Sequence, residues 1–256
     1  MRMRYITPGV DEWPAQLGDL SGSAPAGLWV RGEANLAELC GRSVAIVGAR
    51  ASTPYGEHVA FEMAEGLSCG GFTVVSGGAV GIDSAAHNAA LSGPTPTVAV
   101  LAGGLDRCHP AVNDPLFSRI ADGGGLLVSE YPPGEHPTRE RFLQRNRLIA
   151  ALSQATVVVE GADRSGARST VEWATMLGRP VGATPGSVYS AMSRLPHQLI
   201  REGKATLVAN AADVKELPGL ASPPDLGRAA DEPINVGVAH EQAQELAPAA
   251  AGGVKI

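Results

Sequence analysis

Short runs rich in valine and alanine recur along this chain, and segments with apolar residues at helical spacing separate them. Seven runs have the composition of strands buried on both faces: residues 44–47, 72–76, 98–101, 126–129, 156–160, 181–184 and 205–208. Four intervening segments each place apolar residues on one helical face: residues 57–68, 84–91, 145–152 and 170–177. This alternation predicts an α/β protein with a Rossmann-like, doubly wound, mostly parallel sheet and helices on both faces.

Composition divides the chain into three parts. Residues 1–40 contain three prolines, and we expect a lead-in that packs as a cap. Residues 41–217 carry the strand and helix pattern and form the predicted Rossmann-like binding domain. Residues 218–256 are acidic, rich in Pro, Ala and Gly and poor in large apolar side chains, which predicts a disordered tail.

Size, charge and cysteine usage narrow the classes of function. The chain has 256 residues, 44% of them apolar, which is enough for one substantial core. Its formal charge of −6 argues against a generally basic DNA-coating protein, so a nucleic-acid site has to be a local basic pocket. Three widely spaced cysteines match no zinc motif, and the N-terminal stretch does not resemble a signal peptide. We expect a cytoplasmic protein without metal or membrane span.

Glycine-containing turns follow the first two strands of the predicted domain. The stretch SVAIVGAR places Gly48 and Arg50 after the first strand, and SGGAVGID places Ser76, Gly77 and Gly81 after the second. Backbone N–H groups at strand-to-helix turns, together with a guanidinium, can hold a phosphate or carboxylate. The sequence therefore predicts a site for a phosphate-bearing ligand.

Two later turns, at residues 103–104 and 164–166, also follow predicted strands, and the second contains Ser165 and Gly166. Ligands of open parallel sheets bind beyond the carboxyl ends of the strands. We therefore expect the four turns to converge on one crevice at that edge.

Arginines and an aromatic residue are concentrated in the segment RFLQRNR. It contains Phe142, Arg145, Asn146 and Arg147, and the apolar run LIAALS follows it. Because that run must be buried, we expect the basic residues to gather at the N-terminal end of the helix, near the crevice. A ring among guanidinium groups suits single-stranded nucleic acid, whose bases stack while arginines meet the phosphates.

Several enzyme classes find little support. The dinucleotide fingerprint does not follow the first strand and no Gly-Lys-Ser/Thr occurs, which disfavours a conventional nicotinamide enzyme and a P-loop hydrolase. Asp83 and His87 share a helical face. Either Asp83 caps the helix and His87 is a structural histidine, or the two form an acid–base dyad. His109 and His197 have no partner at metal or triad spacing. No catalytic residue is assigned.

Taken in order, the motifs resemble the DNA-processing protein A family, also called DprA or Smf. They are SVAIVGAR, SGGAVGIDSAAH, VAVLAGGLDRCHP, LLVSEYPPG, RFLQRNRLIAALS, VVVEGADRSGA and GRPVGATPG, within residues 5–217. The resemblance implies an extended Rossmann fold and a homodimer that binds single-stranded DNA, without cofactor or enzymatic activity. It also implies protection of incoming strands and loading of the RecA recombinase in natural transformation and recombination.

The resemblance assigns roles residue by residue. Arg50 matches the arginine of the family's Gly-Ser-Arg turn, and the matching DNA contacts are Gly48, Ser76, Gly77, Gly81, Phe142, Arg145, Asn146, Arg147, Ser165 and Gly166. The chain departs from the family at Val80, where an arginine is common, and at residues 103–104, where a cysteine-glycine pair is common. Many relatives carry a winged-helix domain, whereas here only the Pro/Ala-rich tail follows Leu217.

Two alternatives remain open. Residues 166–172 faintly resemble the Pro-Gly-Gly-x-Gly-Thr-x-x-Glu turn of phosphoribohydrolases that cleave cytokinin nucleotides, in which Glu172 would stabilise an oxocarbenium-like state. The same crevice could instead serve a sensor of a small phosphorylated ligand.

Overall fold

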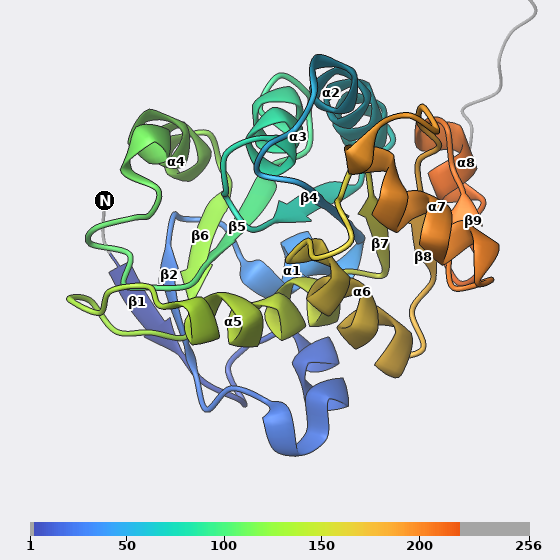
Figure 1. Ribbon diagram of the computed structural model, residues 1–256. Helices are drawn as coiled ribbons and strands as arrows, with labels where there is room; N and C mark the ends of the chain where they lie inside the picture. The colour runs from blue at the N-terminus through green and yellow to red at the C-terminus, as the bar shows by residue number, and fades with distance from the viewer. Residues whose placement is uncertain (1–2, 221–256) are drawn as a thin grey trace, which may run out of the picture. The chain divides into compact units, whose positions relative to one another are not determined.

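A nine-stranded mixed sheet forms the centre of the computed structural model, which describes residues 3–220 (Figure 1). Its strands are β1 (Met3–Ile6), β2 (Leu28–Arg31), β3 (Ser43–Val47), β4 (Thr73–Ser76), β5 (Thr97–Leu101), β6 (Leu126–Ser129), β7 (Ala155–Val158), β8 (Val181–Ala183) and β9 (Thr206–Leu207). The order across the sheet is β1-β2-β6-β5-β4-β3-β7-β8-β9. Strands β3 to β9 pair in parallel, and β1 and β2 pair antiparallel, so the predicted mostly parallel sheet is confirmed.

Helices cover both faces of this sheet. They are α1 (Leu36–Gly41), α2 (Pro54–Cys69), α3 (Ile82–Ala90), α4 (Asp114–Asp122), α5 (Arg139–Ala151), α6 (Ala167–Met176), α7 (Arg194–Arg201) and α8 (Ala211–Lys215), with 3-10 turns η1 (Ala15–Ser23), η2 (Ala111–Asn113) and η3 (Ala191–Ser193). Side chains of α2, α3, α4 and α8 pack on one face, and those of η1, α1, α5, α6 and α7 on the other. The doubly wound arrangement is thus confirmed.

Strand β3 explains the unbroken apolar runs. Val44 and Ile46 pack into the core on one face of the sheet, while Ala45 and Val47 pack into the core on the other. Every residue of the strand is buried, so no position is left for a polar side chain that faces water.

The winding of the chain reverses between β3 and β7. From β3 the chain proceeds outward through β4, β5 and β6, and α5 then crosses back along one face so that β7 pairs on the other side of β3 (Figure 1). The carboxyl ends of β3 and β7 therefore flank the topological switch point, where open α/β sheets form their ligand crevices.

The N-terminal segment contributes two strands that the sequence analysis did not predict. Strands β1 and β2 form a hairpin, and β2 joins the edge of the sheet beside β6. Arg4 fixes the segment, since its guanidinium donates to the carbonyls of Gly32 and Ala34 and pairs with Glu12 at 2.7 Å. The boundary at residue 40 stays a prediction.

At the other end, Leu217 and Leu220 are both buried against the α2 and α3 side of the core. The predicted disordered tail is residues 218–256, and from residue 221 onward it lies outside the described residues. Within residues 3–220, no helix combines the length and the apolar character that a membrane span needs.

Candidate nucleic-acid interface

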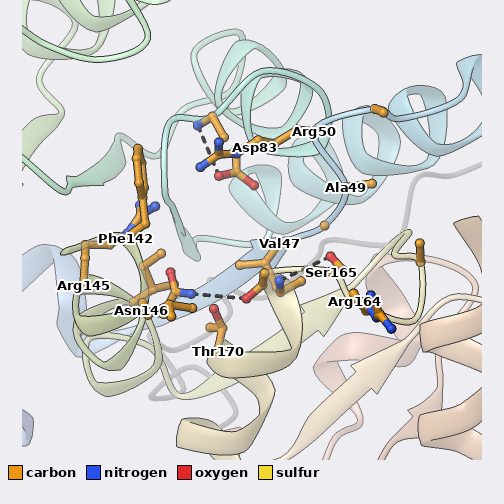
Figure 2. Close-up of a pocket in the computed structure, with 18 of the residues that line it drawn as sticks. Val47, Ala49, Arg50, Asp83, Phe142, Arg145, Asn146, Arg164, Ser165 and Thr170 are labelled. Atoms are coloured by element: carbon orange, nitrogen blue, oxygen red, sulfur yellow. Dashed lines mark hydrogen bonds between the residues drawn. The ribbon is translucent and has the colours of Figure 1, made fainter. Parts of the chain in front are cut away.

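A cavity of about 460 Å³ lies at the switch point, bounded by the segments that follow β3 and β7, by α5 from Phe142 to Ile149 and by the first turn of α6. We call it the switch-point cavity. Seven of the predicted site residues line it: Gly48, Arg50, Phe142, Arg145, Asn146, Ser165 and Gly166. In Figure 2 the labelled side chains of this set surround one hollow: Arg50 from the turn after β3, Phe142, Arg145 and Asn146 from α5, and Ser165 from the turn before α6.

Glu160 stabilises the turn that carries Arg50. The Glu160 carboxylate is buried and accepts hydrogen bonds from the Thr53 N–H at 2.8 Å and from the Thr53 hydroxyl at 2.7 Å. Thr53 in turn caps α2 by accepting the N–H of Gly56. Gly48 is required here because a Cβ would lie 2.9 Å from the Glu160 carbonyl oxygen and 2.6 Å from Cγ1 of Ile82.

The second glycine loop supports this turn from the side. Gly81 has φ of +83°, and a Cβ there would lie 2.7 Å from the Arg50 carbonyl oxygen. Ser76 is buried beneath, where its hydroxyl donates to the Ile46 carbonyl at 2.6 Å. Gly77 leaves space for the Arg145 guanidinium and lines a small cavity of about 50 Å³ next to the main one. Ser76 and Gly81 thus shape the site without lining the switch-point cavity.

An aromatic ring between guanidinium groups forms the wall that the cavities share. The Arg50 Cζ lies over the Phe142 ring at 4.6 Å from its centroid, and the Arg145 Cζ lies over it at 5.8 Å. His109 packs against the same ring in a T-shaped arrangement, with centroids 5.9 Å apart. Arg50 is exposed and takes part in no ion pair within residues 3–220, so its charge is available to a ligand.

Arg145 supplies a second, fixed positive charge. Only 4% of it is exposed, and its guanidinium donates to the Val100 carbonyl. Burial lowers the pKa of Arg145 to about 10, against the opposing effect of Asp83, so the group stays protonated at neutral pH. Burial also raises the pKa of Asp83, whose carboxyl group accepts the Ala79 N–H at 3.2 Å. Asp83 therefore orders the loop beside Arg145.

Asn146 joins the two helices that border the cavity. Its amide donates to the Gly166 carbonyl at 3.2 Å, a bond drawn in Figure 2, and so ties α5 to the start of α6. Ser165 accepts the Ala167 N–H at 3.3 Å, which leaves its hydroxyl proton free to donate to a ligand.

Two predicted elements lie elsewhere. Arg147 does not line the cavity, because its Nη2 donates to both carboxylate oxygens of Glu130 at 2.7 and 2.9 Å and its Nε donates to the Ser23 carbonyl. The turn at residues 103–104 also stays apart, since Gly104 donates its N–H to the Glu135 carbonyl at 2.8 Å. Of the four turns expected to converge, those carrying Arg50 and Ser165 line the switch-point cavity, and the Ser76–Gly81 loop lines it through Ala79.

The histidines have structural partners. His87 is fully buried, and its Nδ1 lies 2.8 Å from the Thr97 hydroxyl oxygen, which favours the structural histidine over a dyad with Asp83. Burial lowers the pKa of His87 to about 3. His197 is bonded to the Gly186 backbone. Among residues 3–220, no three His, Cys, Asp or Glu side chains are grouped to hold a metal ion.

Sequence reasoning missed several lining residues. Arg164 lies at the cavity rim, and its signal was the turn at residues 164–166, from which only the two following residues were assigned. Met192 and Thr170 also line the cavity. Met192 is brought there because its carbonyl accepts the Gly161 N–H after β7, a long-range contact without a sequence signature.

A family model and individual relatives of known name match this chain and indicate the same family. The model of the family described as DNA recombination-mediator protein A matches residues 4–218. A Mycobacterium tuberculosis protein with the name DprA is 50% identical over 226 residues, covering 84% of this chain and 58% of the relative. The DNA processing protein DprA of Streptococcus pneumoniae is 40% identical over 204 residues, covering 80% of this chain and 70% of that protein.

Two solved structures are similar to the fold described above. The X-ray structure of DprA from Streptococcus pneumoniae has a TM-score of 0.76 at 38% identity, covering 84% of this chain and 74% of that one. A Helicobacter pylori DNA processing protein A, whose single-stranded DNA binding mode was described, has a TM-score of 0.73 at 30% identity, covering 82% and 94%. By these matches, the chain belongs to the DNA recombination-mediator protein A family.

Proposed function

We propose that this chain binds single-stranded DNA in the switch-point cavity. The observation that carries the proposal is the Phe142 ring with Arg50 4.6 Å from its centroid and Arg145 5.8 Å from it, at the rim of a cavity of about 460 Å³. Unstacked bases bind aromatic and guanidinium faces, and the same guanidinium groups meet the phosphates.

Single strands suit this site better than duplex. A cavity of this size admits a base that has left its stack, whereas duplex bases are already paired and stacked. The formal charge of −6 gives no general attraction to a duplex surface, so affinity depends on a few local contacts. Likeness to the Helicobacter pylori protein, described as binding single-stranded DNA, supports the same choice.

The wider role follows from family membership. The chain spans 58% of the length of its Mycobacterium tuberculosis relative, so the activities of whole relatives are proposals for it. We propose a cytoplasmic homodimer that protects single strands and delivers them to the RecA recombinase in transformation and recombination. Sedimentation of the purified chain tests the dimer, and RecA filament assembly on strands coated with single-strand binding protein tests delivery.

We propose a binding protein in place of an enzyme, because Glu172 lies outside the switch-point cavity, on the exposed side of α6. Arg168, which replaces a glycine of the phosphoribohydrolase turn, is held by the Gln198 amide oxygen at 2.8 Å. Incubation with nucleoside monophosphates tests this choice. Release of free base would favour the phosphoribohydrolase, and saturable binding that displaces DNA would favour a small-ligand sensor.

The main experiment compares a labelled oligo-dT with a duplex of equal length across a salt series, by fluorescence anisotropy. We expect on the order of three to five phosphate contacts, hence a log–log salt slope of about −2 to −3.5 for the single strand. Duplex binding of equal strength would contradict the proposal.

A further inference from the structure

A second cavity of about 680 Å³ adjoins the switch-point cavity, between the first turns of α5 and α6. We call it the outer cavity. The two cavities share the residues of their common mouth: Arg50, Phe142, Leu143, Arg164, Ser165 and Gly166. A ligand that fills the first and is too long for it therefore has an open path into the second.

Arg164 stands at this mouth with an available charge. It is exposed and takes part in no ion pair in the part of the chain that the structure describes. The neighbouring carboxylate of Asp163 pairs with Arg194 at 3.3 Å. Arg168, one turn further, donates to the Asp163 carbonyl and to Gln198. Of these neighbouring guanidinium groups, that of Arg164 alone has no protein partner among residues 3–220.

Hydroxyl donors accompany that guanidinium. Ser165 and Ser169 both line the outer cavity, and the Ser165 oxygen accepts the Ala167 N–H, so its proton can be donated outward. A guanidinium with nearby hydroxyl groups is the donor set that positions a phosphodiester. Glu172 also lines this cavity, is exposed, and pairs with no cation within residues 3–220, so it opposes an anion there.

We infer that the outer cavity is a second phosphate subsite, with Arg164 as its anchor, and that a bound strand leaves the switch-point cavity between the starts of α5 and α6. The inference rests on the proposed single-strand function and adds the path of the strand. Arg164 attracts the phosphate that follows the nucleotide in the switch-point cavity, while Glu172 limits how tightly that phosphate is held.

The test uses the full chain and an oligo-dT long enough to fill both cavities, with anisotropy measured across a salt series. Arg164→Gln should weaken binding about threefold to tenfold and lower the magnitude of the salt slope by about 0.7, the value for one phosphate contact on a single strand. Glu172→Gln should strengthen binding about twofold to threefold. Arg201→Gln is the matched control, because Arg201 is an exposed arginine at the end of α7 and lines neither cavity.

Strand length provides the second measurement. A thymidine dinucleotide, used as an unlabelled competitor, should bind the parent and the Glu172→Gln protein equally well, because it does not need the outer cavity and Glu172 does not line the switch-point cavity. The inference is overturned if Arg164→Gln behaves like Arg201→Gln while the parent binds oligo-dT. It is also overturned if Glu172→Gln weakens binding. If the parent itself fails to bind oligo-dT, the proposed function fails and the subsite falls with it.

Discussion

Arg50 and Phe142 should act as a coupled pair in strand binding. Arg50→Ala removes a guanidinium that takes part in no ion pair within residues 3–220, and should weaken single-strand binding by about 1.5–3 kcal/mol. It should also lower the magnitude of the salt slope by about 0.7, one phosphate contact. Phe142→Ala should weaken binding by about 1–3 kcal/mol with the slope unchanged, because stacking on a base releases no counterions.

The structure adds a coupling that single variants hide. The Phe142 ring orients the Arg50 guanidinium at 4.6 Å, and no hydrogen bond of that guanidinium is present within residues 3–220. Removing the Phe142 ring therefore also reduces the contribution of the Arg50 charge to the binding free energy. The double variant should lose less than the sum of the single variants, by about 0.5–1 kcal/mol, the usual strength of an exposed cation–π contact.

The assay is anisotropy of labelled oligo-dT with the parent, both single variants and the double variant, after circular dichroism has shown that all four are folded. Losses that add to within about 0.3 kcal/mol would refute the coupling. Single variants that bind like the parent would remove the switch-point cavity as the DNA site.

Three predictions concern stability. Glu160→Gln should lower the free energy of unfolding by about 1–3 kcal/mol in urea denaturation, because the buried carboxylate accepts two hydrogen bonds at the start of α2. A chain that ends after Leu220 should keep its stability to within about 1 kcal/mol, whereas ending after Leu217 removes a buried leucine and should lose about 1–2 kcal/mol in the same assay. Burial lowers the pKa of His87 to about 3, so between pH 6.5 and 3 the unfolded chain binds a proton that the folded chain does not. As the pH is lowered below about 6.5, the contribution of His87 to the free energy of unfolding should therefore decrease, by up to roughly 1.4 kcal/mol per pH unit.

Controls make these outcomes decisive. The raised pKa of Asp83 has the opposite effect on stability, because the folded protein keeps the Asp83 proton to higher pH than the unfolded chain does. The His87 effect is therefore measured as the difference in stability between the parent and His87→Gln. An equal pH dependence of the two proteins would contradict the His87 account. Equal stability of the two truncated chains would mean that Leu220 contributes nothing, and unchanged unfolding of Glu160→Gln would remove the role of its carboxylate.

The core of the fold could be predicted because its strands are buried on both faces. Val44 to Val47 give an unbroken apolar run, and such runs separated by helical periods permit few arrangements other than a doubly wound sheet. Strands β1 and β2 gave no comparable signal. Each is only four residues long, and Ile6 is the single buried residue of β1. The prolines of the first 40 residues also indicate turns more strongly than strands.

The candidate site could be predicted as a set of turns but not as a set of contacts. Arg145 and Arg147 are two residues apart on α5, a separation of about 200° around a helix, so both side chains cannot face one cavity. That constraint could be derived from the sequence. The ion pair of Arg147 with Glu130 could not, because Glu130 lies in another segment and nothing in the sequence around it indicates this pairing. The separation of the turn at residues 103–104 likewise depends on Glu135, whose backbone position only the folded chain fixes.

Pairing of β3 with β7 has a consequence for the order of events during synthesis. Val44 pairs with Ala155, so the two walls of the switch-point cavity come from distant parts of the chain. A nascent chain that has emerged only through α5 already contains Arg50 and Phe142 but lacks the wall that follows β7. Contacts at such separation form late in folding. Strand binding should therefore appear only once the second half of the sheet has docked, which makes it a functional readout of completed folding.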